Sequence, residues 1–213
     1  MLGIVLYDWC TTEIWSVQKA MNTWRDYMVS MGFGYQLGID LPGEKRGMIP
    51  NAQYYDKAYR RSWNGLTIIS ISIGQGEVTA TPLQIANLGA TIANRGYFVT
   101  PHVVKEIEGE SIDSIYTTRR YTKVDKGHYE EVVQGMRSAV LGGTCRTANI
   151  PELEICGKTG TAQNHGKDHS AFMGFAPMNN PKIAIAVYVE NGGWGATYGV
   201  PIGKLMIEKV FDW

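Results

Sequence analysis

Two short apolar segments near the C-terminus constrain the fold more than any other feature of the sequence. Residues 170–176 and 182–189 are rich in apolar, aromatic and β-branched side chains, and Met178-Asn179-Asn180-Pro181 lies between them. Apolar runs of this length bounded by Asn and Pro are typical of strands joined by a tight turn. The pattern predicts an antiparallel hairpin, and residues 152–163 predict a further strand of the same sheet.

The clearest helix signal lies at Thr81-Pro82-Leu83-Gln84. Thr81 can cap the helix, proline is favoured in the first turn, and Gln84 can reach back to complete a capping box. These residues predict a helix that runs from Pro82 to Arg95 and is closed by Gly96.

Apolar residues at the helical spacing of three and four predict further helices over residues 12–31 and 129–141, and from Pro201 onward. Residues 32–65 are rich in Gly, Pro and Asn and predict a long ordered loop. Short extended segments are predicted over residues 97–107 and 114–121. An antiparallel sheet flanked by helices gives an α/β (α+β) fold class, in one domain without an internal boundary.

Composition excludes several classes of function. The 213 residues are 44% apolar and 19% charged, which is typical of a globular domain, or of a large piece of one. Twenty basic and twenty acidic side chains cancel, so nucleic acid is not an expected partner. Every apolar stretch falls far short of the about 20 residues of a membrane-spanning helix, so no transmembrane segment is expected in this chain.

Metal and cofactor sites are not expected either. No spacing of Cys and His suggests zinc. Gly74-Gln75-Gly76 starts like a dinucleotide-binding fingerprint, but Thr79 stands where the third glycine belongs.

The segment Lys158-Thr159-Gly160-Thr161 combines groups that an acyl-transfer site needs. Lys158 supplies a positive charge near a substrate carboxylate, and the hydroxyls of Thr159 and Thr161 can donate to that carboxylate. Gly160 lets a substrate backbone approach closely, and the backbone N–H of Thr161 can stabilise an oxyanion. The plainer alternative for these four residues alone is an exposed polar strand end.

Four segments, in order, carry a resemblance to class B penicillin-binding proteins, and most of all to penicillin-binding protein 2. They are GFGYQLGIDLPGE at 32–44, GQGEVTATPLQIANLGATIANRG at 74–96, GKTGTAQ at 157–163 and HSAFMGFAP at 169–177. The likeness extends over about residues 24–210 and concerns only the C-terminal portion of the family's transpeptidase domain. Residues 1–7 are not expected to be family sequence. The resemblance implies a fold shared with serine β-lactamases.

The resemblance also implies three motifs, of which this chain carries only Lys-Thr-Gly. Ser16-Val17-Gln18-Lys19 and Ser62-Trp63-Asn64 fit the family's Ser-x-x-Lys and Ser-x-Asn patterns on paper. Both motifs precede the GFG and LPGE segment in the family, which excludes Ser62. Ser16 lacks the expected surroundings and leaves no room for a second motif. We therefore expect no catalytic residue in this chain and an inactive fragment whose nucleophile lies upstream.

The function that the resemblance implies is peptidoglycan D,D-transpeptidation by serine acyl transfer, with β-lactams as inhibitors. Expected partners are peptidoglycan stem peptides, the lipid-linked precursor and other cell-wall elongation proteins. The expected location is the periplasmic side of the bacterial inner membrane, with a membrane-anchored parent protein. Two alternatives stay open: a truncated homologue that only binds, and a serine β-lactamase or sensor.

Three finer expectations concern single residues. Lys158, Thr159 and Thr161 are expected to face one groove, because residues 159 and 161 share a strand face and Lys158 sits at the turn into the strand. Cys145 and Cys156 form either a disulfide, as a periplasmic location would allow, or two buried free thiols. His169 is expected to make a structural hydrogen bond rather than to transfer a proton.

Overall fold

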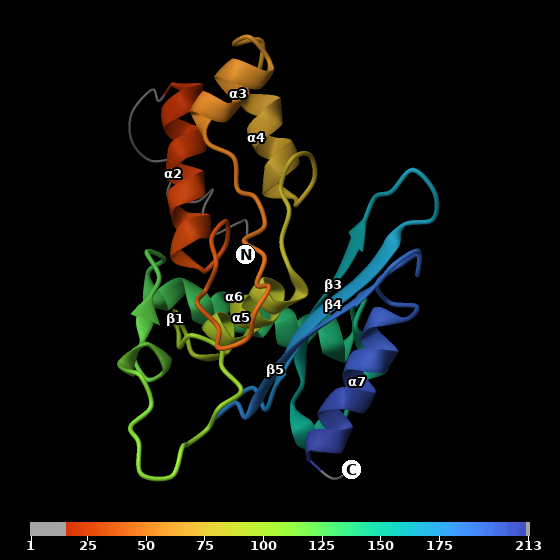
Figure 1. The fold of residues 1–213 in the computed structure, drawn as a ribbon. Coiled ribbons are helices and arrows are strands. Elements are labelled where there is room, and N and C mark those ends of the chain that lie inside the picture. The colour runs from red at the N-terminus through yellow and green to blue at the C-terminus, as the bar shows by residue number, and fades with distance from the viewer. Residues whose placement is uncertain (1–15, 212–213) are drawn as a thin grey trace. The chain divides into compact units, whose positions relative to one another are not determined.

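The structure is a computed structural model that describes residues 16–211 (Figure 1). These residues form two compact units. The first consists of the residues up to Thr81 together with Phe98–Val124, and the second consists of Pro82–Tyr97 together with the residues from Asp125 onward. Residues 12–15 of the predicted first helix lie outside the described residues.

The second unit is built on a three-stranded antiparallel sheet of β3 (Cys156–Ala162), β4 (His169–Ala176) and β5 (Ile183–Val189), in that order. Thr159 pairs with Phe172, and Phe172 pairs in turn with Val187. The predicted hairpin is thus confirmed. The strand predicted from residue 152 begins later, because Pro151–Leu153 form a 3-10 turn and Glu154 adopts a left-handed conformation.

Helices cover both faces of this sheet (Figure 1). Helix α7 (Gly199–Val210) packs on the face that carries Phe172, so closely that a Cβ added at Gly203 would lie 2.4 Å from the Phe172 ring. Helix α5 (Pro82–Ala93) packs on the opposite face, where Gly89 approaches the side chain of Met173. Phe172 and Met173 are neighbours in β4 and therefore point to opposite faces.

The main core of the second unit joins α6 (Lys126–Leu141) to the sheet and to α7. Asp125 caps α6 by accepting the N–H of Gly127, so the helix begins before the predicted residue 129. The core combines side chains from α6, the segment before β3, the sheet and α7: Val140, Cys145, Ala148, Ile150, Leu153, Ile155, Phe172, Ala176, Ile185, Val187, Val200 and Ile207.

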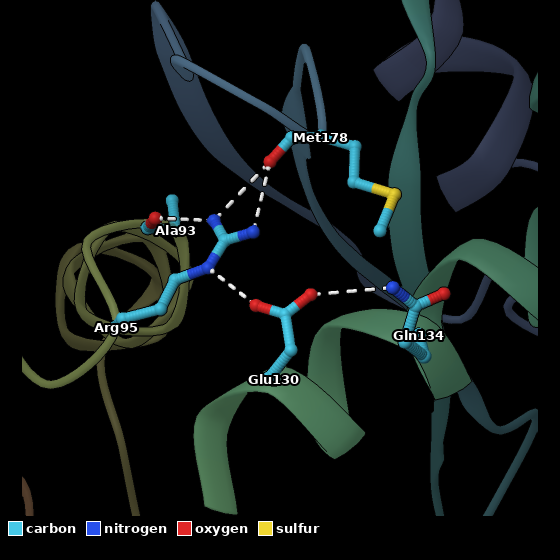
Figure 2. A network of polar contacts seen from close by, with 5 residues as sticks. All are labelled: Ala93, Arg95, Glu130, Gln134 and Met178. Carbon is cyan, nitrogen blue, oxygen red and sulfur yellow. Dashed lines mark hydrogen bonds and ion pairs between the residues drawn. The ribbon is translucent and has the colours of Figure 1, made fainter. Parts of the chain in front are cut away.

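Arg95 ties the end of α5 to α6 and to the turn between β4 and β5, as Figure 2 shows. Its guanidinium donates to the carbonyl oxygens of Ala93 and Met178, and Nε lies 3.2 Å from Glu130 Oε2. Glu130 also accepts a hydrogen bond from Gln134. Arg95 has a φ of 57°, which is the left-handed conformation expected where a helix ends.

The first unit contains α2 (Val17–Ser30), α3 (Ala52–Ala58) and α4 (Gly65–Ser72). Met21 and Trp24 bury the apolar face of α2, as the sequence predicted. The prediction of a loop over residues 32–65 is wrong where α3 forms. Asn51 caps α3 and Asn64 caps α4, so each helix starts from a local side-chain hydrogen bond.

Of the short strands or extended segments predicted over residues 97–107 and 114–121, only part forms strands, and the prediction is wrong at residues 114–116. Only β1 (Tyr97–Phe98) and β2 (Arg120–Tyr121) are strands, and Ser114–Tyr116 form the 3-10 helix η1. The rest of the 97–107 segment is held at one point by Asp40, whose carboxylate accepts the N–H groups of Val103 and Val104.

Candidate functional site

The Lys158–Thr161 segment lies in the middle of β3, at the edge of the described sheet. Thr159 and Thr161 share the face that carries Phe172, as the spacing predicted. Lys158 is a strand residue paired with Met173, so its side chain leaves from the opposite face. The expectation that Lys158 sits at the turn into the strand is therefore wrong.

Both threonine hydroxyls have partners from other parts of the second unit. Thr159 Oγ lies 2.9 Å from Thr144 Oγ, in the segment after α6. Thr161 Oγ accepts the N–H of Gly195 at 3.3 Å, from the loop between β5 and α7. Thr159 is half-buried and Thr161 is exposed, so neither residue is buried in the core.

The side chain of Lys158 shows which way the backbone groups of β3 point. Its Nζ donates to the carbonyl oxygen of Thr159 at 2.8 Å, so that carbonyl points away from β4. In an antiparallel strand the N–H and C=O of one residue point the same way, and the direction alternates from residue to residue. The N–H of Thr161 therefore also lies at the open edge.

The loop from Glu190 to Tyr198 packs directly on this strand. A Cβ added at Gly195 would lie 2.5 Å from the carbonyl oxygen of Gly160, so only glycine fits there. Two residues of β4 anchor the loop: His169 Nδ1 accepts the N–H of Asn191 at 3.0 Å, and Ser170 Oγ donates to Trp194 O at 2.9 Å. His169 thus makes the structural hydrogen bond that the sequence analysis expected.

A hollow of about 480 Å³ adjoins this loop on the side of the β3–β4 turn. Lys167 and Asp168 line it from the turn, and Trp194 and Tyr198 line it from the loop. Trp194 is 74% exposed, which makes it the most exposed of the large apolar side chains along residues 16–211.

The structure decides between the two alternatives for the cysteines. Cys145 and Cys156 are free and buried. Cys145 belongs to the core on the Phe172 face, whereas Cys156 pairs with Phe175 and points to the face that carries Met173. The sheet thus separates the two thiols. Burial raises the pKa of Cys145, and it raises the pKa of Cys156 to about 11.

The serine patterns of the first unit have structural roles. Ser16 Oγ caps α2 by accepting the N–H of Lys19 at 3.2 Å. Ser62 is exposed beyond α3, and Asn64 caps α4. Ser16 and Asn64 therefore cap helices, and Ser62 lies at the surface.

Thr144 and Gly195, which contact the two threonines, were missed by the sequence analysis. No pattern marks Thr144, whose partner is fifteen residues away. Gly195 belongs to a glycine-rich stretch with Gly192 and Gly193, which is a sign of close backbone approach.

Within residues 16–211, no helix has the length and apolar character needed to cross a membrane. Over the same range, no group of three or more His, Cys, Asp or Glu side chains is arranged to hold a metal ion.

A helix-covered antiparallel sheet with Lys-Thr-Gly on its edge strand matches the fold and the motif that the resemblance to penicillin-binding proteins implies. The family model described as the penicillin binding protein transpeptidase domain matches residues 8–208. The chain belongs to this family. Two relatives, one a curated protein and one a solved structure, confirm the class B, penicillin-binding protein 2 type that the motifs indicate.

The peptidoglycan D,D-transpeptidase MrdA of Acinetobacter baumannii is 39% identical over 215 residues, which cover 91% of this chain and 30% of that protein. The structure of Pseudomonas aeruginosa PBP2 in complex with WCK 5153 superposes with a TM-score of 0.78 at 35% identity, covering 88% of this chain and 42% of the other. The complex between PBP2 and MreC from Helicobacter pylori gives 0.73 at 28% identity, covering 93% of this chain and 36% of the other. The chain thus spans about a third of the length of such relatives.

Proposed function

We propose that this chain is part of a peptidoglycan D,D-transpeptidase that cross-links stem peptides by serine acyl transfer. A stem peptide ending in D-Ala-D-Ala acylates the serine and releases its last D-Ala, and an amine of a second stem peptide then takes the acyl group. The serine lies outside these 213 residues in this proposal, and the fragment alone is inactive. The observation that carries the proposal is the arrangement of Lys158–Thr161 on the open edge of β3.

Each residue of the motif has a role that its geometry supports. Lys158 supplies positive charge at the edge, and the hydroxyls of Thr159 and Thr161 are positioned to donate to the terminal carboxylate of the substrate. Gly160 leaves room for the peptide backbone beside β3. The N–H of Thr161 points to the open edge, where it can donate to the oxyanion that forms during acyl transfer. Together these groups form one wall of a substrate groove.

The relatives support proposals for the partners and the location. Because a Helicobacter pylori relative was solved as a complex with MreC, we propose that the longer protein acts with cell-wall elongation proteins. Its substrates are stem peptides and the lipid-linked precursor, and it works on the periplasmic side of the inner membrane, to which it is anchored. β-Lactams bind it because they imitate the acyl donor.

The decisive experiment is covalent labelling with a fluorescent penicillin. Three proteins are compared: this chain, its Ser16→Ala variant, and a longer form that carries the upstream segment of the gene. We expect a stable adduct on the longer form only. An adduct on this chain that disappears in Ser16→Ala would overturn the assignment of Ser16 as a helix cap without catalytic function.

The same experiment separates the alternatives. Rapid loss of the adduct with turnover of the drug would indicate a β-lactamase, because a transpeptidase holds the acyl group much longer. No adduct on the longer form would indicate a homologue that only binds. In the longer form, Thr161→Val should slow labelling, whereas Thr197→Val, at an exposed residue of the neighbouring loop, should not.

A further inference from the structure

Ser170, in the middle strand of the described sheet, makes two hydrogen bonds to the segment that leads from β5 into α7. The residue is fully buried, with an exposed fraction of 0%. Its Oγ donates to the carbonyl oxygen of Trp194 at 2.9 Å and accepts the N–H of Gly199 at 3.0 Å. Gly199 is the first residue of α7, whose N-cap residue makes no side-chain cap within residues 16–211. Ser170 thus takes the place of a local cap for α7.

A single peptide group of the loop connects Ser170 to Thr161. The carbonyl oxygen of Trp194 accepts from Ser170, and the N–H of the next residue, Gly195, donates to Thr161 Oγ at 3.3 Å. These two groups belong to one planar peptide unit, in which the C=O and the N–H point in opposite directions. Ser170 and Thr161 are directly paired across β4 and β3, so both side chains leave the sheet on the same face. The peptide group therefore bridges the two hydroxyls.

The hydrogen bonds of this bridge all run in one direction. The first N–H of α7 donates to Ser170, Ser170 donates to the carbonyl of the peptide, and the N–H of that peptide donates to Thr161. A hydroxyl has one hydrogen and two lone pairs. Because Thr161 Oγ accepts from the loop, its own hydrogen points away from the loop. Bonds in such a series polarise one another, which strengthens the last hydroxyl as a donor.

We propose that Ser170 is a positioning residue that, through the Trp194–Gly195 peptide, directs the hydrogen of the Thr161 hydroxyl toward the terminal carboxylate of the substrate. This role rests on the function proposed above, in which Thr161 binds that carboxylate. Ser170 is buried beneath the loop, so it acts through Thr161 and makes no contact with the substrate.

Glycines let the loop come close enough to β3 and β4 for these bonds to form. A Cβ added at Gly195 would lie 2.6 Å from the carbonyl oxygen of Ala171, and one added at Gly192 would lie 2.9 Å from the Cβ of Ser170. Such distances exclude any side chain at these two positions unless the loop moves. The backbone of the loop therefore lies directly on Ser170 and its neighbour in β4.

The loop has other contacts that remain when Ser170 is replaced. The N–H of Thr197 also bonds to Trp194 O, at 2.9 Å, and the N–H of Gly193 donates to Asp168 O at 2.7 Å. The turn of the loop and its link to the β3–β4 turn are thus independent of Ser170. Replacing Ser170 by alanine frees the bridging peptide from β4 and leaves the rest of the loop in place.

Acylation of the longer form by a fluorescent penicillin tests this role. Ser170→Ala removes both hydrogen bonds with little change in volume, and it should slow acylation by about threefold to tenfold. Thr91→Val is the matched control, because Thr91 is also fully buried and its Oγ also donates to a backbone carbonyl, that of Asn87. Thr91 belongs to α5, on the opposite face of the sheet, so its variant should stay within about twofold of the wild type.

A double-mutant cycle separates positioning from a general structural effect. If Ser170 acts through Thr161, its replacement matters only while Thr161 carries a hydroxyl. In a Thr161→Val background, Ser170→Ala should therefore change the acylation rate by less than about twofold. Slowing by the same factor in both backgrounds would overturn the proposal and leave the proposed transpeptidase function intact.

Hydrogen exchange of the longer form measures the bridge without any reaction. In Ser170→Ala, the slowest amides of residues 191–199 should exchange about tenfold faster, because Gly199 loses its acceptor. In Thr91→Val their exchange should be unchanged. Unchanged exchange in Ser170→Ala would contradict the bridge itself. Failure of the unaltered longer form to react with penicillin would instead overturn the proposed function, and the role of Ser170 with it.

Discussion

The hydroxyls of Thr144 and Thr159 lie 2.9 Å apart and link the segment after α6 to the Lys-Thr-Gly strand. A threonine hydroxyl rotates freely unless a partner holds it, and Thr144 is the partner in this structure. Thr144 therefore acts as a positioning residue for the hydroxyl that we assign to substrate binding.

The first prediction follows from this contact and applies to the longer form that carries the upstream segment. Thr144→Val should slow acylation by a fluorescent penicillin by about threefold to tenfold, which corresponds to the loss of one hydrogen bond. Thr144→Ser keeps the hydroxyl and should stay within about twofold of the wild type. An unchanged rate in Thr144→Val would mean that Thr159 needs no partner to bind substrate.

The second prediction concerns the stability of the second unit. Arg95→Met removes the bonds to Ala93, Met178 and Glu130 while keeping a long unbranched side chain. The Arg95 side chain is 18% exposed, so carbonyl groups near it are left without partners. We expect the free energy of unfolding to fall by about 2–3 kcal/mol.

Urea unfolding measures this change, because the midpoint falls with stability. Lys204→Met is the control, since it removes only the ion pair with Glu208 on the surface of α7. It should cost no more than about 0.5 kcal/mol. Equal losses in both variants would contradict a special role for Arg95.

The third prediction concerns pH and the first unit. Tyr55 Oη donates to Glu77 Oε2 at 2.7 Å, and Tyr59 donates to the other carboxylate oxygen. Burial by itself raises the pKa of Glu77, but the two hydrogen bonds outweigh it and hold the pKa below the ordinary value of 4.5. Because the pKa of Glu77 is lower in the folded chain than in the unfolded chain, its carboxylate stabilises the fold at pH values above the ordinary pKa. This contribution to stability is lost as the pH falls through the pKa of the folded chain.

Tyr55→Phe should therefore lower stability at neutral pH by about 1–2 kcal/mol and make the loss of stability below pH 4.5 less steep. Thermal melting between neutral and acidic pH measures both effects. Tyr54→Phe keeps the ring that packs against Tyr55 and should leave the pH profile unchanged. A profile for Tyr55→Phe parallel to that of the wild type would contradict the coupling to Glu77.

The fourth prediction concerns thiol chemistry. The thiolate is the reactive form, and burial raises the pKa of Cys156 to about 11 and also raises that of Cys145. Iodoacetamide at neutral pH should therefore label neither residue in the folded chain and both in urea. Peptide mapping by mass spectrometry distinguishes them from the remaining cysteine. Detection of a Cys145–Cys156 disulfide in the folded chain would contradict their placement on opposite faces of the sheet.

Some elements could be predicted because their signals are local. The apolar spacing in α6 and the apolar runs of β4 and β5 with the turn between them are properties of neighbouring residues, whereas the cap at Asp125 was not predicted. Helix α4 shows where such signals fail. It contains Thr67, Ile68, Ile69 and Ile71, which are β-branched and favour strands, yet Asn64 caps it and Ile68 and Ile71 are buried.

The sequence by itself determined the family, the hairpin and the four residues of the Lys-Thr-Gly segment, because each is contained in a short run of residues. Only the tertiary structure decided that Lys158 and Thr159 leave β3 on opposite faces, since that depends on where the strand begins. It also decided that Thr144 and Gly195 hold the two threonine hydroxyls. Such contacts join residues far apart in the chain, and packing of the whole unit selects them rather than any local preference.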